Sequence, residues 1–160
     1  MNISIILAAG ESTRMKSKLS KVLHRVCGKP LLEYIIDASK GAKVDKNIVI
    51  VGHSGNQVKE YFKDEDIIFK TQPIGEGIPY GTGFAVMQAT EYIEDDSTVV
   101  ILYGDTPLIR ESTITNLFKY HEENKLDATV LTAILDDPTD YGRIVREENG
   151  DILKIVEEKD

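Results

Sequence analysis

The chain has 160 residues, a formal net charge of −8 at pH 7 and a sequence pI near 4.9. Hydrophobic residues make up 41% of the chain and charged residues 29%, which is ordinary globular composition and excludes wholesale disorder. The acidic balance argues against generic binding to nucleic acid or anionic membranes, and no apolar run approaches the roughly 20 residues that span a bilayer. Met1 is not followed by the basic region of a secretory signal, and a single cysteine excludes an intramolecular disulfide. These features predict a cytoplasmic protein with no nucleic-acid or membrane partner.

Short apolar runs rich in β-branched residues alternate along the chain with segments of helical period. Buried strands are predicted at residues 3–7, 47–51, 67–71, 98–103 and 128–135. Helices are predicted at residues 31–39, 57–62, 84–93 and 111–123. Strands that alternate with helices are typical of right-handed crossovers. The sequence therefore predicts an α/β fold with a doubly wound, mainly parallel sheet.

The last part of the chain has a different pattern. Residues 143–147 and 151–157 flank Asn149-Gly150, a dipeptide that favours the positive φ angles of a tight turn. We therefore expect a C-terminal antiparallel hairpin. The sequence has no internal repeat and no linker, so residues 1–160 are expected to form a single domain. Because the chain stops directly after a predicted strand, we expect that domain to be truncated at its C-terminal end.

The loop after the first predicted strand contains small residues and is followed by cations. It reads Leu7-Ala8-Ala9-Gly10-Glu11-Ser12-Thr13-Arg14-Met15, and six basic residues stand against one acidic residue between positions 10 and 30. Small residues let a backbone approach a flat ring or a phosphate, and Arg14 and Lys21 could bind phosphate oxygens. The spacing fits neither the Walker motif nor the dinucleotide fingerprint, which argues against a dinucleotide-dependent oxidoreductase. The alternative is a plain turn beside a solvated basic face.

A second candidate loop, Tyr103-Gly104-Asp105, follows the strand predicted at residues 98–103. Ligands of doubly wound sheets bind beyond the carboxyl ends of the strands, so Asp105 and the first loop are expected at the same edge. Mg²⁺ prefers oxygen ligands and is often held by one or two carboxylates together with substrate phosphates. Asp105 alone could equally cap a turn before Thr106-Pro107. The two loops together favour metal-assisted chemistry on a phosphate.

A set of short motifs runs in order over essentially the whole chain. After the opening loop come Lys21-Val22-Leu23-His24, Gly28-Lys29-Pro30, Val51-Gly52-His53, Gln72, Gly81-Thr82-Gly83, Leu102-Tyr103-Gly104-Asp105, Pro107-Leu108-Ile109, Asp137-Pro138, Tyr141-Gly142-Arg143-Ile144-Val145 and Ile155-Val156-Glu157-Glu158-Lys159-Asp160. This series resembles the nucleotidyltransferases that activate sugar phosphates. Within them it is most similar to the N-terminal pyrophosphorylase (uridyltransferase) domain of bacterial N-acetylglucosamine-1-phosphate uridyltransferases. The chain departs from that pattern at Ser20, where proline is usual, at Phe84, where histidine is common, and in a longer loop over residues 73–80.

The resemblance implies a Rossmann-like nucleotidyltransferase fold and a role for each matching residue. The nucleotide would be bound by Leu7, Ala8, Ala9, Gly10, Gln72, Gly81, Thr82 and Tyr103. The catalytic residues Arg14 and Lys21 would hold the triphosphate, and Asp105 would bind the implied cofactor, Mg²⁺. Gly142 and Glu157 would contact the amino sugar.

The reaction implied by the resemblance is a Mg²⁺-dependent nucleotidyl transfer from UTP to N-acetylglucosamine 1-phosphate, which are then the small-molecule partners. Its products would be pyrophosphate and UDP-N-acetylglucosamine, a precursor for peptidoglycan and cell wall biogenesis. The family's domain continues beyond the matched residues, and its acetyltransferase repeat domain has no counterpart in this sequence. Two alternatives stay open: a nucleotidyltransferase for a different sugar phosphate or base, and a non-catalytic nucleotide-binding fragment.

Overall fold

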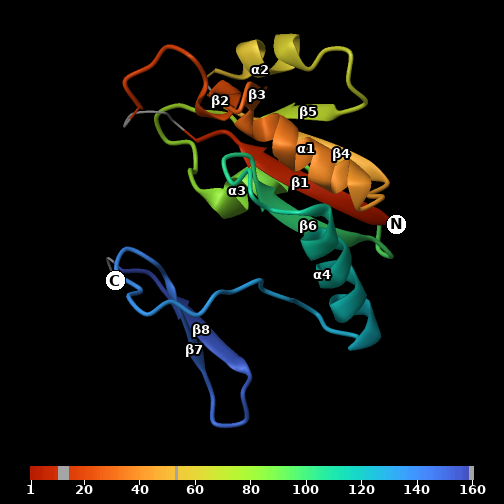
Figure 1. Ribbon diagram of the computed structural model, residues 1–160, viewed down its shortest axis with the longest axis vertical. Helices are drawn as coiled ribbons and strands as arrows, with labels where there is room; N and C mark the ends of the chain where they lie inside the picture. The colour runs from red at the N-terminus through yellow and green to blue at the C-terminus, as the bar shows by residue number, and fades with distance from the viewer. Residues whose placement is uncertain (11–14, 53, 159–160) are drawn as a thin grey trace. The chain divides into compact units, whose positions relative to one another are not determined.

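A parallel four-stranded sheet forms the centre of the larger part of the chain (Figure 1). The computed structural model describes residues 1–10, 15–52 and 54–158. The strands are β1 (Asn2–Ala8), β4 (Lys46–Val51), β5 (Ile68–Thr71) and β6 (Thr98–Tyr103), in the order β5-β4-β1-β6. Leu7 on β1 is paired with Ile50 on one side and with Tyr103 on the other, and every pairing is parallel. After β1, the chain adds β4 and then β5 on one side of it, and β6 then pairs with the other side of β1. This order confirms the predicted doubly wound sheet.

Helices cover both faces of this sheet. On one face, α1 (Leu31–Gly41), α2 (Gly55–Tyr61) and α4 (Glu111–Glu123) share a core with the strands, formed among others by Ile6, Leu32, Ile36, Val49, Val58 and Ile114. On the other face, α3 (Thr82–Met87) contributes to a second core that contains Ile3, Ile5, Ile48, Ile50, Ala85 and Ala89. Because the strands are buried on both sides, their sequences are nearly continuous apolar runs.

The helix predicted at residues 111–123 has the same bounds in the structure, and the other predicted helices are present with shifted bounds. The segment predicted as one helix at residues 84–93 is instead α3 followed by the short 3₁₀ helix η3 (Thr90–Tyr92). A second 3₁₀ helix, η2 (Lys21–Leu23), follows the first loop and buries Val22 and Leu23. Among the helices of the described residues, none has the length and apolar character needed to cross a membrane.

The hairpin between η2 and α1 was not predicted from the sequence. Its strands β2 (Arg25–Val26) and β3 (Lys29–Pro30) are antiparallel, and the two residues between them, Cys27 and Gly28, have φ of +50° and +82°. Positive φ at both central positions is the geometry of a type I′ turn, which matches the twist of a hairpin. A cysteine at the first of these positions is unusual, so Gly28 was the only residue of the pair that could have indicated the turn.

Contacts divide the chain into two compact units, residues 1–128 and residues 129–160. The second unit contains the antiparallel pair β7 (Arg143–Arg146) and β8 (Ile152–Val156). Gly150 has φ +93°, and the backbone N–H of Asp151 donates to Asn149 Oδ1 at 3.0 Å. The predicted C-terminal hairpin is therefore confirmed, but its connection is the loop of residues 147–151 rather than a two-residue turn, and of Asn149 and Gly150 only Gly150 has a positive φ.

The strand predicted at residues 128–135 is wrong. The segment has no strand pairing in the described part of the chain, and Leu131 and Ile134 expose 55% and 102% of their surface. A strand exists only with a neighbouring strand to accept its hydrogen bonds. Strand propensity measures how well side chains fit such a half-buried surface, so apolar and β-branched residues could not form the strand by themselves.

Gly52 lets the loops that follow β1 and β4 approach each other. A Cβ atom at this position would lie 2.4 Å from the backbone oxygen of Ala9, so the backbone would have to move. We expect Gly52→Ala to lower the free energy of unfolding by about 2 kcal/mol, measured by urea denaturation. Gly83→Ala is the matched control, because a Cβ there has nothing within 4 Å and α3 gains a better helix former. Equal stability of the two variants would contradict the close approach.

Candidate functional site

A cavity of about 230 Å³ lies at the carboxyl ends of β1 and β6. It is lined by Leu7, Ala8, Ala9, Gly10, Lys21, Val22, Gln72, Tyr80, Gly81, Thr82, Ala85, Tyr103 and Asp105. The order in which strands are added to the sheet reverses between β1 and β6. Doubly wound sheets bind their ligands at such a reversal. Ten of the residues for which the family resemblance implied nucleotide, phosphate or metal binding line this one cavity.

The end of β1 supplies a wall of small residues. Ala8 and Ala9 are each 8% exposed, so little more than backbone is offered to a ligand at this point. Gly10 is the last residue of this stretch that the structure describes, and it is open to solvent. Larger side chains would fill the cavity, whereas a backbone edge can meet a flat ring at close range.

Lys21 and Asp105 approach each other across the cavity. The Lys21 Nζ atom donates to Asp105 Oδ2 at 2.5 Å, although the two residues are 84 positions apart in the sequence. Lys21 opens η2, and Asp105 follows β6. Their side chains are 42% and 32% exposed, and an ion pair of this exposure contributes at most about 1 kcal/mol. Substrate phosphates or a cation can therefore separate the pair at low cost.

Gln72 has a buried amide group that the described part of the chain leaves unpaired. The residue is 4% exposed, and its Nε2 atom has no hydrogen-bond partner among the residues that the structure describes. The Gln72 backbone is fixed, because its N–H donates to Val51 O at 2.8 Å just beyond β5. A buried donor without an acceptor costs about 1–3 kcal/mol, so native proteins rarely keep one without a reason. Since Gln72 lines the cavity, a ligand oxygen would satisfy this donor.

Two tyrosines bring aromatic surface to the cavity. Tyr103, which the resemblance included, is 51% exposed, and Tyr80, which it did not include, is 67% exposed. Tyr80 ends the long loop and stands directly before Gly81, whose φ of +126° lies in the left-handed region. Val22 and Ala85 also line the cavity without having been predicted. The position of Tyr80 directly before the Gly81-Thr82 motif was the sequence signal that could have indicated its place at the cavity.

The other three predicted site residues are Arg14, Gly142 and Glu157. Arg14 lies outside the described residues. Gly142 and Glu157 belong to the unit of residues 129–160, where they are neighbours: a Cβ on Gly142 would lie 3.3 Å from Glu157 Oε2. A larger residue at position 142 would press on this carboxylate.

The residues of the cavity fit a magnesium ion that is coordinated partly by the protein and partly by the phosphates of a bound substrate. The described residues contain no group of three histidine, cysteine, aspartate or glutamate side chains able to form a complete protein site. Mg²⁺ does not need one, since one carboxylate, waters and phosphate oxygens satisfy it. Asp105 is a carboxylate that lines the cavity, so the donor set there fits this requirement.

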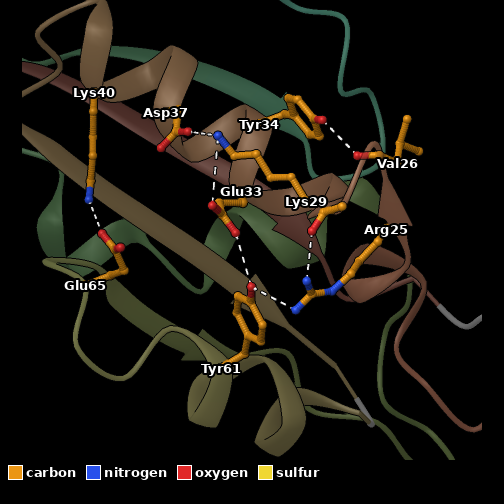
Figure 2. Close-up of polar contacts among 10 residues, drawn as sticks. Arg25, Val26, Lys29, Glu33, Tyr34, Asp37, Lys40, Tyr61 and Glu65 are labelled. Atoms are coloured by element: carbon orange, nitrogen blue, oxygen red, sulfur yellow. Dashed lines mark hydrogen bonds and ion pairs between the residues drawn. The ribbon is translucent and has the colours of Figure 1, made fainter.

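A separate polar network fixes the β2–β3 hairpin outside this cavity (Figure 2). Lys29 forms ion pairs with Asp37 and Glu33 of α1, and Tyr61 of α2 joins Glu33 to Arg25. The hydrogen bond to Asp37 raises the pKa of Lys29 despite a smaller opposing effect of desolvation. The Lys29–Asp37 pair has the same charges as Lys21–Asp105 but lines no part of the cavity, which makes it a useful control.

The chain is similar to known proteins over most of its length. The family described as MobA-like NTP transferase domain matches residues 4–139. Curated relatives include a bifunctional protein GlmU from Clostridioides difficile, 54% identical over 98% of this chain, and one from Listeria monocytogenes, 46% identical over 98%. The chain spans about a third of the length of these relatives, 33% and 34% respectively.

Solved structures show the same fold at low sequence identity. A candidate glucose-1-phosphate thymidylyltransferase from Bacillus anthracis has a TM-score of 0.79 at 22% identity, covering 99% of this chain and 65% of that one. A nucleotidyl transferase from Methanothermobacter thermautotroptrophicus has a TM-score of 0.63 at 20% identity, covering 75% of this chain and 57% of that one. With the parallel sheet, the cavity at its switch point and a family match over residues 4–139, the chain belongs to the MobA-like NTP transferase domain family.

Proposed function

We propose that this chain transfers a uridylyl group from UTP to N-acetylglucosamine 1-phosphate, giving UDP-N-acetylglucosamine and pyrophosphate. The observation that carries the proposal is the single cavity that joins the small-residue edge of β1, the unpaired amide of Gln72 and the Lys21–Asp105 pair. The similarity to bifunctional GlmU proteins at 46–54% identity supports the choice of substrates. Both units, residues 1–128 and 129–160, are proposed to form one nucleotidyltransferase domain of a cytoplasmic enzyme.

In the proposed reaction, an oxygen of the sugar phosphate attacks the α-phosphorus of UTP. A new phosphorus–oxygen bond forms as the bond to pyrophosphate breaks, and the electron pair leaves with pyrophosphate. The attacking phosphate is already ionised, so no general base is required. Both substrates are anionic, and the barrier consists largely of charge repulsion and alignment.

The residues of the cavity meet these two demands. Lys21 holds the phosphates that leave as pyrophosphate, and the β1 edge at Ala8 to Gly10 orients the base and ribose. Arg14, by its place in the opening motif, is proposed to act with Lys21. Asp105 would hold Mg²⁺, which when bound supplies further neutralisation of phosphate charge. Gly142 and Glu157 are proposed to contact the amino sugar.

Gln72 is proposed to read the base through the amide that the protein leaves unpaired. We expect Gln72→Met to weaken UTP binding about tenfold, because the donor is lost. The same change should leave the unfolding free energy unchanged or raise it by about 1 kcal/mol, because a buried unpaired polar group disappears. Calorimetry with UTP and urea denaturation measure the two effects. The control is Gln88→Met, since Gln88 Nε2 has a partner in Phe84 O and does not line the cavity. Unchanged UTP affinity in Gln72→Met would exclude this role.

The function is tested by pyrophosphate release with a panel of nucleoside triphosphates and sugar phosphates in the presence of magnesium. Turnover that is fastest with UTP and N-acetylglucosamine 1-phosphate supports the proposal. Faster turnover with another pair identifies a nucleotidyltransferase for a different sugar or base. UTP binding by calorimetry without any turnover identifies a nucleotide-binding module.

A further inference from the structure

The segment before Lys21 is connected to α2 by one side chain. Gln57 accepts a hydrogen bond from the backbone N–H of Ser20 through Oε1, at 3.1 Å. Its Nε2 atom donates to the backbone oxygen of Lys18, at 3.0 Å. The two ends of one amide therefore pair with two peptide groups of the same segment. Two contacts fix the orientation of residues 18–20 against the helix, whereas a single contact would let them pivot.

The sheet topology explains why Gln57 meets this segment. β1 and β4 are adjacent and parallel, so the connections that follow their carboxyl ends lie at the same edge. α2 begins four residues after β4 and is held by Val58, which is fully buried. Gly55 lies against Val51 so closely that a Cβ there would be 2.7 Å from Val51 Cγ2. Gln57 thus projects from a helix that is itself firmly packed on the sheet.

The contact with Ser20 lies one residue before Lys21. Ser20 precedes η2 and its backbone oxygen accepts from Leu23 N–H at 2.9 Å, while Val22 and Leu23 are buried in the core. Lys21 is consequently held on both sides, by the core after it and by Gln57 before it. Its side chain reaches Asp105 from this position.

We propose that Gln57 is a positioning residue that orients the backbone of residues 18–20 and thereby directs Lys21 toward Asp105 and the substrate phosphates. The inference deepens the proposed function and rests on it for its catalytic consequence. Gln57 lies at the surface, so each of its hydrogen bonds contributes modestly to overall stability. Its main effect is on the direction of Lys21, and small misplacements of a charge-stabilising group reduce turnover strongly.

The first experiment compares Gln57→Met with Asn56→Ala, a control at the neighbouring exposed position of α2, in the full-length protein. We expect kcat for pyrophosphate release to fall about tenfold in Gln57→Met, with little change in the KM for the sugar phosphate. In Gln57→Glu, one carboxylate oxygen can still accept from Ser20 N–H. The other carboxylate oxygen faces the Lys18 backbone oxygen and cannot donate to it, so the kcat of this variant should also fall. Wild-type kcat in Gln57→Met overturns the proposal.

A rescue separates positioning from general destabilisation. Ser20 has φ −53° and ψ 135°, a conformation that proline also favours. Adding Ser20→Pro to Gln57→Met should stiffen the segment without the Gln57 contacts and recover most of the lost kcat. If the double variant is as slow as Gln57→Met alone while both remain folded, the orientation of this segment is not what limits turnover, and the proposal is overturned.

A measurement that does not need turnover tests the contact itself. Brief trypsin digestion of the folded protein, read by mass spectrometry, reports how readily the chain is cut after Lys18. We expect a several-fold faster cut in Gln57→Met than in the wild type or in Asn56→Ala. If the wild type shows no uridylyl transfer, the proposed function fails, and this digestion still decides whether Gln57 orders the segment. An unchanged cutting rate overturns the positioning role whatever the substrate.

Discussion

Asp105→Asn is expected to abolish the response of turnover to magnesium and to lower kcat by on the order of 10³-fold, equivalent to about 4 kcal/mol. Asp105 is the proposed magnesium ligand and the carboxylate that lines the cavity among the described residues, and asparagine keeps its shape while removing its charge. The measurement is a magnesium titration of pyrophosphate release at saturating UTP and sugar phosphate. The expected curve for the variant is low and flat.

Asp37→Asn is the matched control for this experiment. Asp37 is an aspartate paired with a lysine, as Asp105 is, but it lies on α1 in the network of Figure 2 and does not line the cavity. Its variant should keep the wild-type magnesium response. A normal magnesium response in Asp105→Asn would show that the metal is bound elsewhere and would remove Asp105 from the proposed site.

Lys21→Met is expected to lower kcat by about 10²–10³-fold, the usual cost of losing one group that stabilises developing charge. The change should affect kcat more than the KM for the sugar phosphate, because Lys21 is proposed to act on the departing pyrophosphate. Steady-state kinetics of pyrophosphate release at saturating magnesium separate the two parameters.

Lys29→Met provides the corresponding control, since Lys29 also pairs with aspartate but outside the cavity. Its pKa is raised by the hydrogen bond to Asp37, so it carries a full charge at neutral pH, and removing it tests whether loss of any paired lysine slows the enzyme. Equal losses in Lys21→Met and Lys29→Met would contradict a specific role for Lys21.

The combined variant Lys21→Met/Asp105→Asn tests whether the two residues act together. They are 2.5 Å apart and are proposed to meet the same phosphates, so their effects on kcat should be far from additive. A double variant that is no slower than the worse single variant agrees with one charge-handling unit. A loss equal to the product of both single losses would indicate two independent roles.

The sheet could be predicted from the sequence because its physical requirement is local. Strands buried on both faces need continuous apolar runs, and the runs that became β1, β4, β5 and β6 were each recognisable. Asn149-Gly150 predicted the last hairpin for the same reason, since a local change of chain direction is favoured by Gly150, whose φ is positive. At residues 128–135 the same reasoning failed, because a strand also needs a partner and the described chain provides none there.

The amino-acid sequence by itself predicted the residues of the proposed site: a small-residue turn after the first strand, a cation and a carboxylate from their motifs, and an amide from the family resemblance. The tertiary structure alone decided that Lys21 contacts Asp105, that Tyr80 joins the cavity and that Gln57 holds the segment before Lys21. It also decided that the amide of Gln72 is buried with no partner among the described residues. The reason is physical. A motif fixes local backbone and side-chain type, whereas contacts between residues 37 to 84 positions apart arise only when parallel strands bring their carboxyl ends to one edge of the sheet.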